Sequence, residues 1–325
     1  MIRSILLVVL LLVVLLLIIF AVLKIKSSQI KDYYDTENGY RRLISAESDE
    51  QSRLALFARD IAVINADTRD LSDTLTSEAG FLTKCAGGNA LVKKEAMARM
   101  NPASTTKIMT ALCAIKYGNP EDQVTITEDA LITEAGASLA YVEPGQTYTL
   151  QQLLYGLLLP SGNDAANAIA IHIGGSIEGF VDLMNKEAAD IGASDTHFSN
   201  PHGMTAEDHY TTAYDLYLIM NEAVKYKEFT NVCCKDDYNV EYLNPDGTYG
   251  SRLWKNTNKY ILKDRELPEG LSVLAGKTGT TYAAGHCLVL AVKNEKEDTY
   301  IGVILGSDST GSLYDNMDYI ISGVE

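Results

Sequence analysis

The most continuous hydrophobic pattern of the chain lies at its amino terminus. Residues 5–23 contain no polar side chain, and they are preceded by Arg3 and followed by Lys24 and Lys26. As a helix, this run covers roughly 30 Å at about 1.5 Å per residue, which matches the hydrocarbon layer of a bilayer. A cleaved signal has a shorter apolar core and a small-x-small cleavage site, which this segment lacks. The pattern favours an uncleaved transmembrane anchor over residues 1–26.

The next segments change from polar to globular character. Residues 27–58 are largely polar and charged, which predicts a juxtamembrane stalk. We expect one globular domain over residues 59–325, opening with a short strand at 61–65. The Ser-, Thr- and Gly-rich stretch 71–89 is typical of a loop insertion.

Helical spacing begins after Pro102, which suits the first turn of a helix, and continues to Ile115. A second helix is predicted from Thr149, where Thr149 and Gln152 form a capping box, to the helix-ending Pro160. The same periodicity predicts further helices at about 164–173, 214–224 and 313–321.

The last quarter of the chain has the pattern of buried strands. Apolar runs at 271–275, 287–292 and 300–305 are short and bounded by glycine and charge. Helices in the middle of the chain with strands behind them predict an α+β domain. Its largely antiparallel β-sheet would be flanked by helices, with a mainly helical lobe.

Composition excludes some classes of protein. The formal net charge of -16 argues against nucleic acid as a partner, because phosphate binding needs a basic surface. The odd number of cysteines and their spacing exclude a disulfide framework and match no zinc pattern, although one disulfide stays possible. Two of them, Cys113 and Cys287, lie in apolar segments and are expected to be buried. The five are Cys85, Cys113, Cys233, Cys234 and Cys287.

Three short motifs occur in order: Ser104-Thr-Thr-Lys107, Ser161-Gly-Asn163 and Lys277-Thr278-Gly279. In the first, Ser and Lys three residues apart at a helix start share one face, and the helix end favours a developing oxyanion. A serine hydroxyl needs a base within hydrogen-bond reach, and a partly desolvated Lys can be that base. The second motif lies in a turn between helices, and the third on an expected edge strand where Gly279 lets another backbone approach.

A single S-x-x-K match is weak, because a second one begins at Ser28 in the predicted stalk. The ordered set, however, resembles the signature of β-lactamases and penicillin-binding proteins. The S-G-N version is similar to that of the low-molecular-mass D-alanyl-D-alanine carboxypeptidases, serine peptidase family S11. Similar flanking stretches are residues 101–110, 153–166, 200–204 and 211–215, and the resemblance extends from about residue 60 to the C-terminus.

The resemblance implies a β-lactamase/transpeptidase-like fold and a catalytic set that needs no cofactor or metal. Ser104 would be the acylated nucleophile and Lys107 its general base, while Ser161 would relay the proton to the leaving amine. The backbone N–H groups of Ser104 and Thr280 would form the oxyanion hole.

The same resemblance implies the substrate-binding residues. Asn163 would hold Lys107 and the substrate amide, and Lys277 would keep Lys107 neutral and attract the terminal carboxylate of the substrate. Thr278 and Thr280 would hydrogen-bond that carboxylate, beside Gly279.

The implied activity is removal of the terminal D-alanine from peptidoglycan stem peptides ending in D-Ala-D-Ala, with β-lactam antibiotics as inhibitors. This requires an extracytoplasmic domain on a single-pass anchor in the cytoplasmic membrane. Lys24 and Lys26 oppose that orientation, but large domains translocate largely regardless of flanking charge. Family members often carry a further β-rich domain with a C-terminal anchor. Only 46 residues follow Gly279 here, so the N-terminal helix is expected to do the anchoring.

Other functions match less well. Gly276-Lys277-Thr278 lacks the earlier glycine of a P-loop, because Leu271 stands in its place. A class A β-lactamase needs a Glu for deacylation, and its E-x-x-x-N pattern is absent between Asn163 and Lys277. A non-catalytic receptor for peptidoglycan or β-lactams would not need the complete set. Transpeptidation and endopeptidase action use the same machinery and stay open.

The histidines match no metal motif. His197, His202 and His209 are expected to order a loop or to be exposed. His172 and His286 lie in apolar segments, where a core or rim position with a satisfied hydrogen bond is expected.

Overall fold

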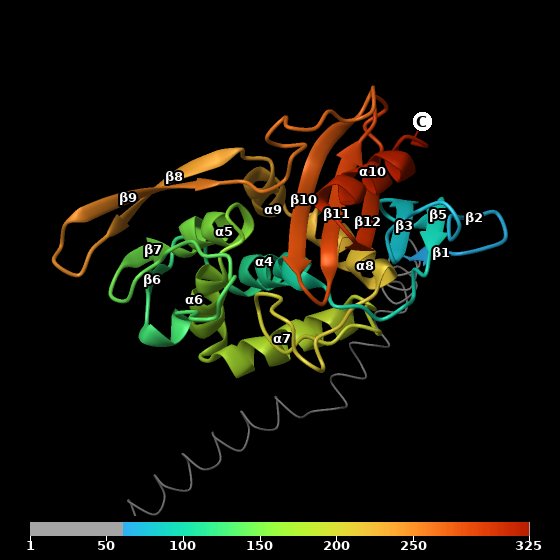
Figure 1. Ribbon diagram of the computed structural model, residues 1–325. Coiled ribbons are helices and arrows are strands. Elements are labelled where there is room, and N and C mark those ends of the chain that lie inside the picture. The colour runs from blue at the N-terminus through green and yellow to red at the C-terminus, as the bar shows by residue number, and fades with distance from the viewer. Residues whose placement is uncertain (1–60, 325) are drawn as a thin grey trace, which may run out of the picture. The chain divides into compact units, whose positions relative to one another are not determined.

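The computed structural model describes residues 61–324, which belong to one compact unit, Arg59–Glu325 (Figure 1). The predicted anchor at 1–26, the stalk at 27–58 and the second S-x-x-K match all lie outside the described residues. Within 61–324, none of the helices combines the length and the apolar character that crossing a membrane requires.

The main sheet has six strands in the order β10-β11-β12-β3-β5-β2, and all neighbours are antiparallel except β2 and β5. This confirms the largely antiparallel sheet, and β10 is its edge strand, as expected for the third motif. The strands are β2 (Arg69–Asp70), β3 (Ala79–Lys84), β5 (Val92–Lys94), β10 (Ser272–Thr281), β11 (Gly285–Lys293) and β12 (Thr299–Ser307). Two further short strands, β1 (Ala62–Val63) and β4 (Gly88–Asn89), pair in parallel.

The predicted loop insertion at 71–89 is wrong. Within it, β3 is an inner strand that pairs with both β12 and β5, and Ala79 through Thr83 are buried. The polar residues before Ala79 hid this strand in the sequence. Because both faces of the sheet are covered, β3 shows a continuous buried run rather than alternation.

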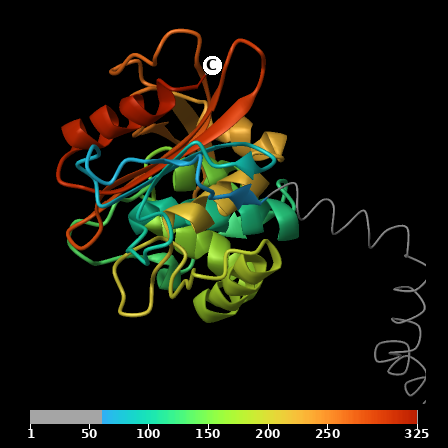
Figure 2. The ribbon, with the colours of Figure 1, turned by 90° about the vertical axis from the view of Figure 1, so that its right-hand side faces the viewer.

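Helices cover the two faces of the sheet unequally (Figure 2). Strand residues alternate between faces: Val289 and Ala291 join the core with the central helices, while Leu288, Leu290 and Val292 pack with α10. The helices are α4 (Lys107–Tyr117), α5 (Leu150–Leu158), α6 (Asn163–Gly174), α7 (Ile177–Asp190), α8 (Ala213–Ala223), α9 (Lys227–Cys233) and α10 (Thr310–Ile321). The predicted helices are confirmed to within a few residues, whereas α7 and α9 were not predicted.

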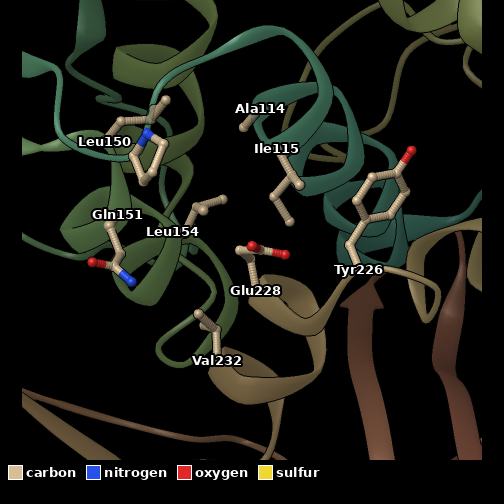
Figure 3. Close-up of a pocket in the computed structure, with 9 residues that line it drawn as sticks. Ala114, Ile115, Leu150, Gln151, Leu154, Tyr226, Glu228 and Val232 are labelled. Atoms are coloured by element: carbon tan, nitrogen blue, oxygen red, sulfur yellow. The ribbon is translucent and has the colours of Figure 1, made fainter.

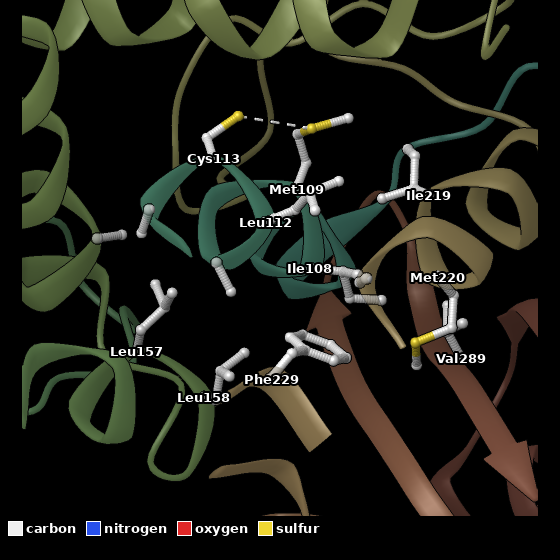
Figure 4. Close-up of a cluster of buried hydrophobic side chains, with 14 of the residues drawn as sticks. Ile108, Met109, Leu112, Cys113, Leu157, Leu158, Ile219, Met220, Phe229 and Val289 are labelled. Atoms are coloured by element: carbon white, nitrogen blue, oxygen red, sulfur yellow. Dashed lines mark hydrogen bonds between the residues drawn. The ribbon is translucent and has the colours of Figure 1, made fainter. Parts of the chain in front are cut away.

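The helix α4 lies at the centre of the larger core. Its apolar residues Ile108, Met109 and Leu112 are fully buried among side chains of α5, α8, α9 and β11 (Figure 4). Burying such a side chain contributes about 1.5–3 kcal/mol. The start of α4 is therefore held firmly, which matters because the first motif lies there.

A second sheet, in the order β6-β7-β8-β9, belongs to the helical lobe. Its strands are β6 (Gln123–Thr125), β7 (Thr147–Thr149), β8 (Asp237–Leu243) and β9 (Tyr249–Lys255). The long β8–β9 hairpin projects from the body in Figure 1. The sequence reasoning did not predict it. Near its base, Trp254 is buried, and its indole N–H donates to the carbonyl of Ala140 over 2.8 Å.

Candidate active site

Ser104 lies in η1, a single 3-10 turn (Ala103–Thr106) that leads directly into α4. The turn begins with a strained residue, Ala103, whose φ is +48°. The neighbouring loop approaches it so closely that a Cβ on Gly203 would lie 1.9 Å from the Ala103 carbonyl oxygen. Gly203 itself has a φ of +93°, so both its backbone conformation and the lack of space for a Cβ require glycine there. This packing fixes the position of the Ser104 hydroxyl.

The terminal nitrogen of Lys107 contacts three oxygens. Its Nζ lies 3.0 Å from Ser104 Oγ, 2.7 Å from Asn163 Oδ1 and 2.6 Å from the carbonyl oxygen of His202. The side chain is completely buried. The structure thus brings together the first two motifs, from η1, α4 and the start of α6.

Burial, followed by the positive charge of Lys277, holds the pKa of Lys107 well below its usual value. The carboxylate of Asp164 opposes this shift as a smaller effect. Lys277 on β10 is itself 1% exposed, and burial lowers its pKa to about 8. A neutral Lys107 beside a Lys277 that still carries charge near neutral pH is the state that these shifts favour.

The neutral amine of Lys107 has two hydrogens and one lone pair. Asn163 Oδ1 and the His202 carbonyl can only accept hydrogen bonds, so they take the two hydrogens. The lone pair is left for the remaining neighbour, Ser104 Oγ. This is the geometry of a general base beside a serine nucleophile.

Ser161 lies in the turn between α5 and α6 with a φ of +64°. Its hydroxyl is buried and has no hydrogen-bond partner among residues 61–324. Behind it, both carboxylate oxygens of Asp164 accept backbone N–H groups, from Ala140 at 2.8 Å and Val142 at 3.0 Å. The carboxylate thereby ties this turn to the loop that contains Ala140 and Val142.

The edge strand β10 approaches η1, the turn that contains Ser104, at Gly279. A Cβ on Gly279 would lie 2.8 Å from the backbone nitrogen of Ser104 and 3.0 Å from that of Thr105. Any side chain would therefore push strand and turn apart. The next residue is Thr280, so the two backbone N–H groups expected to form the oxyanion hole come from adjoining segments.

All three motifs meet at one cavity of about 220 Å³, which contains Ser104, Ser161, Thr278, Gly279 and Thr280. Lys107 and Lys277 are buried beside it. Further lining residues, which the sequence reasoning did not place in the site, are Ser138, Thr257, His286, Thr310, Leu313 and Tyr314. None lies within a motif, so only the fold brings them to the site. Thr257 contacts a motif residue directly, because its hydroxyl lies 2.6 Å from the hydroxyl of Thr278.

Two histidines, His202 and His209, order the loop beside Ser104. Ordering a loop was one of the two expectations for them, and an exposed position was the other. His209 is buried, accepts the backbone N–H of Ser199 at Nδ1 (2.9 Å) and contacts the Thr106 hydroxyl through Nε2 (2.9 Å). His202 accepts the N–H of Met204 at 3.2 Å. Burial lowers the pKa of His209 to about 4 and that of His202 to about 3.

His172 and His197 lie outside this cavity. His172 is exposed and contacts Asp122 at 3.1 Å, and His197 contacts the Asp208 carbonyl at 2.6 Å. Over residues 61–324, no group of three or more His, Cys, Asp or Glu side chains could hold a metal ion. None of the five cysteines forms a disulfide, and Cys113 and Cys287 are buried as expected.

A second cavity, of about 180 Å³, lies between α4, α5 and α9 (Figure 3). Its walls are mainly apolar, including Ile115, Leu154 and Val232, and Glu228 is the one carboxylate that lines it. It contains none of the motif residues. The hydrogen-bonded pair of Ser104 and Lys107 lies at the first cavity, which is therefore the candidate site.

Comparison with known proteins agrees with this geometry. The family model for D-alanyl-D-alanine carboxypeptidases, peptidase S11, matches residues 65–309. D-alanyl-D-alanine carboxypeptidase DacF of Bacillus subtilis is 35% identical over 230 residues, which are 68% of this chain and 55% of the relative. The D-alanyl-D-alanine carboxypeptidase of Streptomyces sp. strain K15 is 32% identical over 247 residues, or 73% of this chain and 82% of the relative.

Solved structures support the same assignment. The crystal structure of the Streptomyces K15 DD-transpeptidase superposes with a TM-score of 0.71 at 31% identity, covering 76% of this chain and 96% of that one. The D-alanyl-D-alanine carboxypeptidase of Mycobacterium tuberculosis H37Rv gives 0.66 at 27% identity, covering 76% and 90%. The matched part spans only about half the length of the Bacillus relative. The chain nevertheless matches the family over most of its own length, and it therefore belongs to the peptidase S11 family of D-alanyl-D-alanine carboxypeptidases.

Proposed function

We propose that this protein is a serine-type D-alanyl-D-alanine carboxypeptidase that removes the terminal D-alanine from peptidoglycan stem pentapeptides and is acylated by penicillin. The main observation in favour of this proposal is the set of hydrogen-bond partners around the Lys107 amine. Two oxygens that only accept occupy its hydrogens and direct its lone pair to Ser104 Oγ. Membership of the family supports the substrate class.

In the proposed reaction, Ser104 Oγ attacks the carbonyl carbon between the two D-alanines and its proton passes to Lys107. The backbone N–H groups of Ser104 and Thr280 stabilise the oxyanion. The C–N bond then breaks, and the proton reaches the leaving amine through Ser161. Water hydrolyses the resulting ester, which regenerates the serine.

The carboxylate of the leaving D-alanine needs partners of its own. Lys277 supplies positive charge, and the hydroxyls of Thr278 and Thr280 face the same cavity as Ser104. In this proposal Asn163, which accepts a hydrogen bond from Lys107, also binds the substrate amide. Hydrogen bonds to a charged group are about twice as strong as neutral ones, so these residues favour a free C-terminal carboxylate.

The experiment is release of D-alanine from a pentapeptide ending in D-Ala-D-Ala by the purified domain. We expect release by the wild type and none by Ser104→Ala. A protein that is acylated by benzylpenicillin but releases no D-alanine would instead be a receptor. Rapid hydrolysis of benzylpenicillin, with no accumulation of adduct, would indicate a β-lactamase.

We also propose that residues 5–23 anchor the protein in the cytoplasmic membrane with the catalytic domain outside. The support is the uncharged apolar run and the extracytoplasmic location of the proposed substrate. Protease added to intact cells after wall removal should release a soluble domain that still binds penicillin. Protection of that domain until lysis would contradict this topology.

A further inference from the structure

His286 faces Thr280 across the β10–β11 ladder, where the two residues are directly paired. Its Nδ1 lies 3.2 Å from Thr280 Oγ1 and 3.4 Å from Thr310 Oγ1, and all three residues line the cavity that contains Ser104. Thr310 is the first residue of α10, which begins beside the end of this hairpin (Figure 1). The imidazole therefore touches the hydroxyl that, in the proposed function, meets the terminal carboxylate.

A threonine hydroxyl has only one hydrogen to donate. If His286 carries its hydrogen on Nε2, Nδ1 can only accept, and Thr280, the nearer of the two hydroxyls at 3.2 Å against 3.4 Å for Thr310, donates its hydrogen to the imidazole. The Thr280 hydroxyl then has no hydrogen left to donate to an anionic ligand. If Nδ1 is protonated, the imidazole donates to a hydroxyl oxygen and the Thr280 hydrogen is free for the carboxylate.

We propose that His286 is a positioning residue that sets the donor direction of the Thr280 hydroxyl and so makes recognition of the ligand's carboxylate depend on protonation. The proposal rests on the proposed function, because it concerns the terminal carboxylate of a D-Ala-D-Ala peptide or a penicillin. The imidazolium always carries a hydrogen on Nδ1 and adds a positive charge. Protonation of His286 therefore strengthens recognition of the carboxylate.

Other ionisable groups lie on the elements around His286. Tyr314 is on α10, Asp308 follows β12, and Glu78 lies against Gly306 of β12. Lys277, three residues before Thr280, has a pKa of about 8 and also gains charge as pH falls. Below about pH 7 that lysine is already largely protonated, so a further change in carboxylate recognition there separates His286 from Lys277.

The test compares two probes, benzylpenicillin and its methyl ester, which differ only in the carboxylate. Second-order acylation rates of the full domain are measured by intact mass from about pH 5.5 to about 8.5, the span in which histidine titrates. Titration of Lys107 affects both probes, so it cancels in the ratio of the two rates. We expect the carboxylate-to-ester ratio of the wild type to rise about tenfold between about pH 7.5 and about 5.5, the effect of one charge-assisted hydrogen bond.

The variants are His286→Asn and His286→Gln, which keep a polar side chain but do not titrate. In both variants, the carboxylate-to-ester ratio of the acylation rates should not change with pH below about pH 7. A flat ratio in the wild type, the same slope in the variants, or an equal loss for both probes would each overturn the proposal. Failure of the proposed function looks different, because then neither probe modifies Ser104 at any pH.

Discussion

At the scale of single residues, the proposed chemistry of the cavity depends on two buried lysines. Lys107 and Lys277 were expected at the site from their motifs, and Lys107 was expected to be desolvated, but the extent of the burial of both side chains could not be predicted. It depends on chain segments far away in the sequence, such as the loop that brings the His202 carbonyl to Lys107. Likewise, His286 and Thr257 carry no motif, and only strand register and loop packing place them at the cavity.

The base role of Lys107 predicts the effect of Lys107→Arg. Burial and the charge of Lys277 lower the pKa of Lys107, so the reactive neutral form is populated above that lowered pKa. Acylation by benzylpenicillin should therefore increase with pH until Lys107 is fully deprotonated. Arg cannot be deprotonated in this range, so Lys107→Arg should lose at least about a hundredfold in acylation rate. Retention of more than about a tenth of the rate would contradict the base role.

The buried hydroxyl of Ser161 gives a second prediction at this scale. It has no hydrogen-bond partner among residues 61–324, so Ser161→Ala removes no hydrogen bond there and keeps the Cβ at the same positive φ. The free energy of unfolding should stay within about 0.5 kcal/mol of the wild type. D-alanine release should fall at least about a hundredfold, because the proton relay is lost. A large loss of stability in urea unfolding would show that the hydroxyl is structural.

At the scale of elements, local signals predicted what local contacts determine. The capping box of Thr149 and Gln152 is present at the start of α5, with both hydrogen bonds formed. In contrast, β3 was missed because its apolar run follows eight residues rich in Ser, Thr and charge. The β8–β9 hairpin was missed because each strand buries only one side chain, Val240 in β8 and Trp254 in β9, so its hydrophobic pattern is weak.

The contact between β10 and η1, the turn that contains Ser104, predicts that Gly279→Ala strongly lowers the acylation rate. The new methyl group would meet the backbone nitrogens of Ser104 and Thr105 at 2.8 and 3.0 Å, and backbone atoms cannot move aside without displacing the turn. Acylation should fall at least about a hundredfold, because small misplacements cost that much in active sites. The control is Gly323→Ala, where the nearest atom is 3.7 Å away. Equal activity of the two variants would show that this close approach is unimportant.

At the scale of the whole molecule, the neutral buried histidines predict loss of stability in acid. His202 and His209 have folded pKa values of about 3 and 4 against an ordinary 6.5, so the unfolded chain binds their protons first. Their stabilising contribution is complete above about pH 6.5 and is lost as pH falls toward 4. Asp215, whose pKa is raised to about 6, acts in the opposite direction. Each pKa unit is worth about 1.4 kcal/mol, so the two histidines together outweigh it.

Urea unfolding at about pH 7 and about pH 4.5 checks this balance, because the histidine contribution changes between those values. The wild type should lose several kcal/mol between them. His209→Asn retains an acceptor for the Ser199 N–H but cannot take up a proton, so it should lose less. An equal loss in variant and wild type would mean that other groups govern acid unfolding.

The proposed activity of the whole molecule depends on one covalent step, the acylation of Ser104 with the help of its neighbouring base, Lys107. Incubation with benzylpenicillin, followed by intact mass and peptide mapping, measures that step directly. We predict a single adduct per chain, located on Ser104, and none in a Ser104→Ala protein with an unchanged circular dichroism spectrum. An adduct that persists in Ser104→Ala, or that maps to the other S-x-x-K serine, Ser28, would contradict the account.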